Sequence, residues 1–210
     1  MKVSSVPKYL MAIVLSIASL NLQGQIRFGR IFGVNLSEMT MKKNGINVDP
    51  TDVAGIHFGG SVDIPLKGGL SFRPGAMFTS KGSMYDLDSV EYFMSPIYIE
   101  VPVNLVFSFG TDAFKISFFS GPYLACGIDG LKIEGSNASR SIRYGSGNGN
   151  DINFFDIGIN FGAGLNFRGL MISAQYGLGL MNIAPETDGE MEMKNNVIGI
   201  SLASFVTRRK

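Results

Sequence analysis

The chain has 210 residues, enough for one domain, and carries 18 Lys and Arg against 17 Asp and Glu, a formal net charge of +1. This balance gives no indication of nucleic acid or of an acidic partner. Hydrophobic residues make up 45% of the chain, charged residues only 17%, and 27 residues are glycine. Because glycine weakens helices, this composition predicts an all-β protein. The single cysteine, Cys126, excludes an intrachain disulfide.

The N-terminus has the three regions of a secretory signal peptide. Lys2 and Lys8 precede an apolar run at 9–20, and Gly24 follows at a plausible cleavage point. An apolar run of about a dozen residues is too short for a spanning helix, which needs about 20. The sequence predicts a signal peptide at 1–24 and one mature domain at 25–210.

The clearest strand pattern lies at 97–109, IYIEVPVNLVFSF. Every second residue from Ile97 to Phe107 is apolar, whereas Glu100 and Pro102 lie in the other phase. Strands of soluble sheets usually have about five or six residues. This segment is longer and matches the roughly 9–11 residues of a tilted strand that crosses a bilayer.

Eight segments of the mature sequence alternate in this way. Short turns and long loops connect them in strict alternation, as in outer-membrane barrels with short periplasmic turns and longer external loops. The sequence therefore predicts an eight-stranded antiparallel up-and-down transmembrane β-barrel, with its termini in the periplasm. The expected strands are 26–37, 53–66, 70–80, 97–109, 114–128, 155–167, 170–183 and 195–206, and the expected long loops are 38–50, 81–94, 130–153 and 184–193.

A soluble barrel or sandwich would need a charged second face, because that face would meet water. The second phase is instead rich in Gly, Ser, Asn and Ala, with only isolated charges such as Lys115 and Asp156. This composition is typical of a narrow barrel interior. The absence of Trp leaves any interfacial girdle to Tyr and Phe.

Short glycine- and aromatic-rich blocks run through the mature sequence. They are FG at 28–29, GVNLS at 33–37, FRP at 72–74, TSKG at 79–82, YIEVP at 98–102, GPY at 121–123, Asp156 with GAGL at 162–165, YGLGL at 176–180 and NNVIGI at 195–200. Their order and spacing resemble the PorT-like outer-membrane β-barrel family of Bacteroidetes. This resemblance implies a barrel of about eight strands in the outer membrane, without a catalytic motif or a cofactor. The name-giving member of that family is associated with protein secretion.

The first segment has one irregularity, Arg30. It falls in phase with Phe28 and Phe32, and an arginine that faces lipid costs roughly 2–4 kcal/mol at the bilayer midplane but little near an interface. The PorT-like pattern would place a basic residue one position later, at Ile31. Two interpretations stay open: a bulge that resets the phase, or an Arg30 that lies near a rim.

His57 is the only histidine and lies on the polar phase of its strand, opposite Thr79 in the expected register. If His57 were a catalytic residue near the external rim, the protein would be similar to the outer-membrane lipid A palmitoyltransferase, a barrel enzyme that uses polar rim residues. A general base also needs a nucleophile and an orienting partner, and the sequence nominates neither. We therefore expect a hydrogen-bonded histidine in the lumen and no enzymatic activity.

Three charged residues are predicted to form a polar network in the lumen: Asp63, Arg73 and Glu100. A three-residue turn at 67–69 places Asp63 opposite Arg73. A charge inside a narrow barrel needs a partner, because burying it alone is costly. We expect the network to hold the strands in register; the alternative role is a proton or ion path.

The expected external loops carry several acidic residues, but their spacing matches no calcium loop. The glycine-rich segment 145–150 precedes no helical pattern, so it does not match a phosphate-binding loop. We expect solvated loops without a metal ion or a cofactor. The acidic residues are Asp49, Asp52, Asp86, Asp88 and Glu91.

The sequence thus predicts a non-catalytic outer-membrane barrel that is a structural or protein-interaction component of the envelope, linked to protein secretion. Its third long loop or its rim is expected to bind another protein or the envelope. Expected partners are outer-membrane lipid and lipopolysaccharide, with other envelope or secretion proteins, and no nucleic acid. A narrow, porin-like transport barrel for small solutes is the main alternative; a lipid-modifying enzyme and a soluble periplasmic carrier follow.

Overall fold

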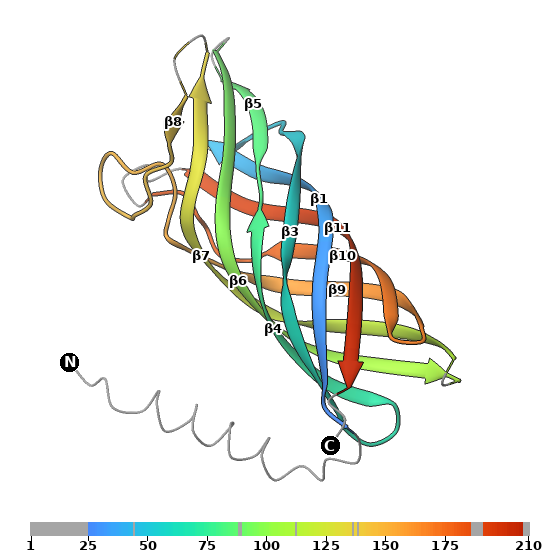
Figure 1. Cartoon of the computed structure of the whole chain (residues 1–210). Coiled ribbons are helices and arrows are strands. Elements are labelled where there is room, and N and C mark those ends of the chain that lie inside the picture. Colours follow the sequence, from blue (N-terminus) through green and yellow to red (C-terminus); the bar gives the residue numbers. More distant parts are fainter. Residues whose placement is uncertain are drawn as a thin grey trace, which may run out of the picture.

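The computed structural model describes residues 25–43, 45–87, 90–111, 113–135, 137, 139–185 and 191–207. These residues form eleven antiparallel strands, most of them long and strongly tilted (Figure 1). The strands are β1 (Arg27–Lys43), β2 (Ile46–Val48), β3 (Thr51–Pro65), β4 (Leu70–Ser80), β5 (Ser83–Leu87), β6 (Val90–Gly110), β7 (Phe114–Glu134), β8 (Arg140–Ser141), β9 (Phe155–Phe167), β10 (Leu170–Gly179) and β11 (Met191–Thr207).

Eight of these strands close into a barrel in the order β1-β3-β4-β6-β7-β9-β10-β11, because β1 pairs with both β3 and β11. The short strands β2, β5 and β8 extend the sheet at one end only. The predicted eight-stranded antiparallel up-and-down barrel is thus confirmed. The predicted signal peptide at 1–24 lies outside the described residues, and no described segment is a helix long and apolar enough to cross a membrane.

Tight turns join the strands at the other end of the barrel, where β1 begins and β11 ends (Figure 1). Arg168 and Gly169 connect β9 to β10 with positive φ angles of 49° and 90°. This two-residue turn matches the right-handed twist of its flanking strands. By the rule that outer-membrane barrels have short periplasmic turns, this end faces the periplasm.

Apolar side chains cover the outside of the barrel, and polar or small side chains fill the inside. On β1, Phe32 and Val34 are 57% and 53% exposed, whereas the next residue, Asn35, is only 2% exposed. This inverted arrangement fits a barrel wall that faces hydrocarbon, and closure of the sheet leaves no open strand edge in the membrane.

Arg30 lies on the outward face of β1, and no bulge resets the phase. The ladder with β11 runs without a break from Arg27 to Lys43, and Ile31 points into the lumen. Arg30 is the fourth residue of β1 and lies close to the periplasmic rim, where an outward arginine has a small free-energy cost. The second of the two open interpretations is therefore the correct one.

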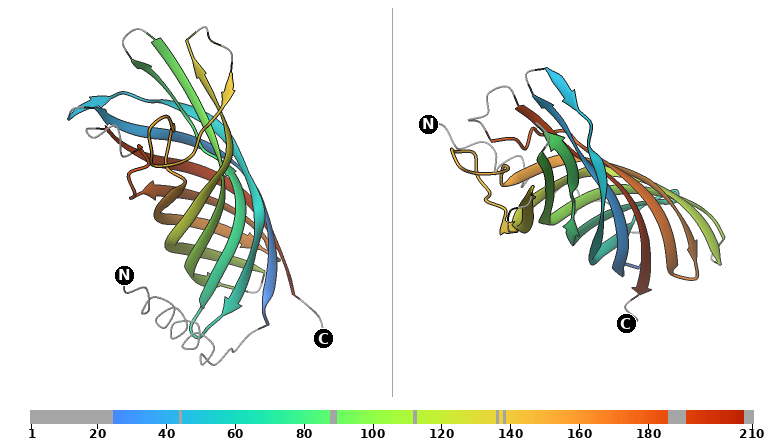
Figure 2. Two further views of the ribbon diagram at one scale, coloured as in Figure 1. Left: turned by 90° about the vertical axis from the view of Figure 1, so that its left-hand side faces the viewer. Right: turned by 90° about the horizontal axis from the view of Figure 1, so that it is seen from above.

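The strands extend further at the external end than the sequence pattern predicts. β6 starts at Val90 instead of 97, β7 continues to Glu134 instead of 128, and β1 continues to Lys43 instead of 37. β10, by contrast, ends at Gly179 instead of 183. The expected loops at 38–50, 81–94 and 130–153 thus contain paired strand, and Figure 2 shows β5–β8 standing above the other strands.

Candidate functional site

The barrel interior is the first candidate site, because it contains most of the buried polar residues. Near the periplasmic end, Asp63 of β3 has no exposed surface and is contacted by three side chains from two strands, β1 and β4. Arg73 Nε lies 2.9 Å from Oδ1, Arg27 Nη2 lies 2.5 Å from Oδ2, and Ser71 Oγ donates to Oδ1 at 2.8 Å. One carboxylate therefore ties β1, β3 and β4 together.

An apolar layer lies next to this network. The Arg73 guanidinium stacks 4.7 Å from the centre of the Phe205 ring, a cation–π contact. Phe205 packs in a buried cluster with Val106, Phe119, Met171 and Ala203. These side chains fill the lumen between the Asp63 network and the polar groups above it.

Glu100, which we expected to join Asp63 and Arg73, belongs to a separate network nearer the external end. Lys81 Nζ lies 3.0 Å from Glu100 Oε2 and 3.0 Å from Asp156 Oδ2. Lys81 is only 2% exposed, although the sequence pattern placed it in an external loop. The predicted trio is thus divided between two networks, one with Asp63 and Arg73 and one with Glu100.

Tyrosines surround the Lys81 network. The ammonium lies 4.3 Å from the ring centre of Tyr123, and Tyr123 donates a 3.3 Å hydrogen bond to Asp156 Oδ2. Asn195 Nδ2 donates to the same oxygen at 3.0 Å, and Tyr98 has no exposed surface. The free-energy cost of burying the Lys81 ammonium and the two carboxylates is offset by their opposite charges, by hydrogen bonds and by the aromatic faces together.

Above this network, an apolar cluster closes the external mouth. Its side chains come from β1, β5, β6, β7, β11 and the segments after β8 and β10, so it joins both sides of the barrel. Methionine and tyrosine dominate it, and methionine fills irregular spaces well. The buried members are Met39, Met41, Tyr85, Met94, Tyr98, Tyr123, Ala125, Ile142, Ile152, Ile183, Ala184 and Met193.

His57 lies midway along the lumen between two hydrogen-bond partners. Its Nδ1 is 2.6 Å from Asn35 Oδ1, and its Nε2 is 2.7 Å from Ser201 Oγ. Asn35 Nδ2 donates to the Ser80 carbonyl oxygen, so Asn35 Oδ1 faces His57; in a neutral imidazole, Nδ1 then donates to Asn35 and Nε2 accepts from Ser201. Gly33 makes room for the ring, because a Cβ there would lie 2.4 Å from His57 Cε1.

This Ser–His–Asn arrangement has the hydrogen bonds of a nucleophile, a base and an orienting group. It lacks space for a substrate: His57 is 1% exposed and Ser201 is 6% exposed. The cavity beside His57 has about 10 Å³, and the cavity beside Ser201 has about 50 Å³. These volumes hold water at most, which favours the expected hydrogen-bonded lumen histidine.

The third long connection is the second candidate site, because its described segment 139–153 is folded and pinned in place. Asp151 accepts hydrogen bonds from Arg140 at 2.6 and 2.7 Å, from Lys132 at 3.0 Å and from the Arg143 amide at 3.0 Å. Burial opposes ionisation of Asp151, but these hydrogen bonds outweigh it and hold its pKa well below the usual range. The carboxylate thus clamps the loop to β7.

Further contacts hold the same loop over the barrel mouth. Tyr144 donates to the carbonyl oxygen of Asp129 at 2.5 Å, and Ile142 and Ile152 are buried in the cluster below. The outer surface of the loop remains open to solvent, with the Arg143 side chain 63% exposed. The loop therefore presents a fixed surface with an exposed arginine at the external end.

The acidic residues expected in external loops form no single cluster. Asp86 of β5 and Glu91 of β6 are cross-strand partners, whereas Asp49 lies between β2 and β3 and Asp52 lies on β3. Asp88 falls outside the described residues. Among the described residues, no group of three or more His, Cys, Asp or Glu side chains is placed to hold a metal ion.

Sequence reasoning did not place Asn35, Lys81, Asp156 or Ser201 in these networks, nor the residues that donate to Asp63 and Asp156: Arg27, Ser71, Tyr123 and Asn195. Lys81 follows Arg73 and Thr79 in the same alternating phase, so extending strand 70–80 by one residue would have placed it inside. Ser201 and His57 both lie opposite Gly33, on its two neighbouring strands, and a glycine there marks the space for a large ring.

A closed antiparallel barrel with an apolar outer belt and a filled polar interior defines an outer-membrane β-barrel protein. The profile of the family described as "Outer membrane protein beta-barrel domain" matches residues 18–184, more than half of the 210 residues. The chain belongs to this family and is a protein of the cell outer membrane. No curated protein matches the chain.

Several solved outer-membrane barrels are similar to the chain at low identity. Ail of Yersinia pestis in complex with sucrose octasulfate is 14% identical, covers 86% of this chain and 99% of its own, and has a TM-score of 0.42. The outer membrane enzyme PagL is 13% identical, with 84% and 99% covered and a TM-score of 0.45. Neisserial surface protein A is 8% identical, with 83% and 96% covered and a TM-score of 0.41. At these identities their functions do not transfer to this chain.

Proposed function

We propose that the protein is a non-catalytic outer-membrane barrel that presents its third external loop to another protein of the envelope. The observation that carries this proposal is the pinned loop around Asp151. Because the clamp already orders the loop, the loop loses little conformational entropy when a partner binds. Pre-organised surfaces bind more tightly for that reason. Arginine is also among the residues that contribute most to protein interfaces.

The resemblance to the PorT-like family of Bacteroidetes supports a partner among secretion proteins. The exposed guanidinium of Arg143 favours an acidic group opposite it on that partner, whereas Arg140 is engaged by Asp151 in the clamp. We do not propose transport, because one apolar cluster closes the external mouth and a second fills the lumen between the Asp63 network and the polar groups above it. Catalysis is not proposed either, because Ser201 and His57 have no room for a substrate.

The first prediction concerns the native particle. Extracted from its own outer membrane in mild detergent, the wild-type chain is expected in a particle larger than a monomer, with one reproducible companion. The Arg143→Glu variant is expected to lose the companion, because reversing a central interface charge weakens binding by about tenfold or more. Size-exclusion chromatography with mass spectrometry of the companion measures both.

Arg168→Glu is the matched control, since Arg168 lies in the turn between β9 and β10 at the opposite end. It should keep the companion. A monomer-sized wild-type particle without a companion would overturn the proposal, and so would an Arg143→Glu variant that keeps its companion.

The second prediction concerns conductance. In a planar bilayer, the purified chain is expected to give no discrete current steps, because the cavities at Ser201 and His57 have only about 50 and 10 Å³. A water-filled porin measured in the same bilayer is the control. Reproducible current steps from the folded chain would contradict the proposal and favour the alternative, a narrow transport barrel for small solutes.

A further inference from the structure

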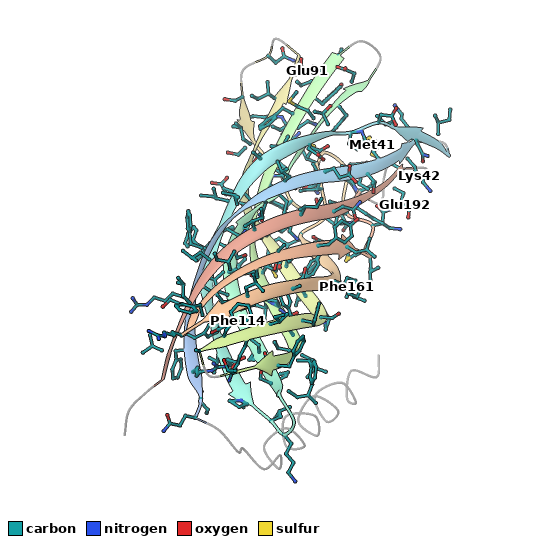
Figure 3. The ribbon with its side chains drawn as sticks, turned by 90° about the vertical axis from the view of Figure 1, so that its right-hand side faces the viewer. Met41, Lys42, Glu91, Phe114, Phe161 and Glu192 are labelled. Carbon is teal, nitrogen blue, oxygen red and sulfur yellow. The ribbon has the colours of Figure 1, made fainter. Side chains whose placement is uncertain are left out.

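A small cavity of about 50 Å³ lies inside the barrel and extends from Arg73 to Ser201. Phe161, which Figure 3 labels, lies on the outer face of β9 at the same height, because the next residue, Gly162, pairs with Gln175 of the lining. The cavity therefore sits in the wall-enclosed lumen, between the Asp63 network and the hydrogen-bond partner of His57.

The volume of the cavity admits only small particles. A cavity needs at least about 10–15 Å³ for each water molecule that it holds, so this one has room for about three. A monatomic halide such as chloride is only slightly larger than a water molecule and fits in the same space. Phosphate, sulfate and organic substrates are too large for it.

The charge of the lining favours an anion over a cation. Arg73 is the one charged residue among the described residues that line the cavity, and no carboxylate lines it. Hydroxyl, amide and guanidinium groups all donate hydrogen bonds, which a halide accepts. The other polar residues of the lining are Ser61, Asn104, Ser173, Gln175 and Ser201.

Arg73 uses only part of its guanidinium for the Asp63 network. Its Nε lies 2.9 Å from Asp63 Oδ1, and its Nη1 lies 3.6 Å from the Met171 sulfur, which is a weak acceptor. No described residue accepts a hydrogen bond from Arg73 Nη2. The network also contains two guanidinium groups, of Arg27 and Arg73, for one carboxylate. It thus has one positive charge in excess, and a buried charge needs a partner.

Ser61 supplies a second donor that the protein itself leaves unused. The residue is 8% exposed, and its buried Oγ has no hydrogen-bond partner in the described part of the chain. A buried hydroxyl without a partner is unfavourable, so such a group indicates a bound water or ion. Water alone would satisfy the hydroxyl but would leave the excess positive charge beside it uncompensated.

We propose that this cavity binds a halide ion, normally chloride, which accepts hydrogen bonds from Ser61 Oγ and Arg73 Nη2. Water fills the remaining space and donates to Asn104 Oδ1, another buried atom without a partner among the described residues. The ion compensates the excess charge of the Asp63 network and so stabilises the junction of β1, β3 and β4. This inference does not rest on the proposed protein partner, because the cavity and the third loop share no residue.

The third prediction tests the site with chloride at constant ionic strength. The purified chain is refolded into detergent micelles in mixtures of potassium chloride and potassium gluconate, and urea unfolding is followed by circular dichroism. We expect the urea midpoint to rise with chloride concentration, because a ligand that binds only the folded state stabilises that state. Ser61→Ala should need about tenfold more chloride for the same rise, since it loses one hydrogen bond to a charged group.

Ser71→Ala is the matched control. It also removes a buried serine hydroxyl beside Asp63, but Ser71 donates to Asp63 Oδ1 and does not line the cavity. Its chloride dependence should therefore equal that of the wild type. A wild-type midpoint that does not respond to chloride, or an Ser61→Ala variant with the wild-type response, would overturn the proposal.

Diffraction locates the ion without any variant. In crystals of the wild-type protein grown with bromide, we expect one anomalous peak in the cavity, within hydrogen-bond distance of Ser61 Oγ and the Arg73 guanidinium. Bromide on the outer surface only, with water alone in the cavity, would contradict the site.

Discussion

Replacing Asp63 with asparagine is expected to lower the free energy of unfolding by about 3–5 kcal/mol, because it leaves the largely buried charge of Arg73 and the half-buried charge of Arg27 without their counter-charge. Arg73 is 11% exposed and points at the Asp63 carboxylate from 2.9 Å, and Arg27 meets the other oxygen. Asparagine keeps the shape of the side chain, so the loss reports charge and not packing. Urea unfolding in detergent micelles, followed by circular dichroism, measures it; the chain has no Trp for fluorescence.

A second substitution in the same network separates a lost ion pair from general damage. Arg73→Gln in the Asp63→Asn background should recover part of the lost stability, because the uncompensated charge is removed. Asp49→Asn, at an exposed position, should change the free energy of unfolding by no more than about 0.5 kcal/mol. An Asp63→Asn variant as stable as the wild type would show that the network does not hold the strands.

The barrel could be predicted from the sequence because the membrane imposes a simple rule on each strand. Lipid on one side and a narrow lumen on the other require strict alternation, and Ile97 to Phe107 shows it without reference to any other strand. The strand ends could not be predicted in this way. Above Leu36 the outward residues of β1 meet water and become polar, so the alternation disappears while the backbone ladder continues to Lys43.

The polar networks could be predicted only where two strands share a turn. The turn at 67–69 places Asp63 beside Arg73, and the structure brings these two side chains together. The contact between Lys81, which directly follows β4, and Asp156 on β9 crosses the lumen between strands that do not pair. Such a contact depends on the stagger of the whole barrel, which no single hairpin contains.

The Lys81 network is expected to be at least as important for stability as the Asp63 network. Lys81→Met keeps a similar side-chain length but leaves Glu100 and Asp156, each 3.0 Å from the ammonium in the wild type, without a shared cation. We expect a loss of about 3–5 kcal/mol, because two like charges remain buried in a medium of low dielectric constant. The same urea titration measures the change.

Neutralising the carboxylates in the Lys81→Met background tests the cause. The triple variant with Glu100→Gln and Asp156→Asn should be more stable than Lys81→Met alone, since the repelling charges are gone and a hydrogen-bonded neutral core remains. Lys67→Met, in the exposed turn between β3 and β4, is the control and should leave stability unchanged. If the triple variant is less stable than the single one, packing around Lys81 and not charge compensation dominates, and the account of this network is wrong.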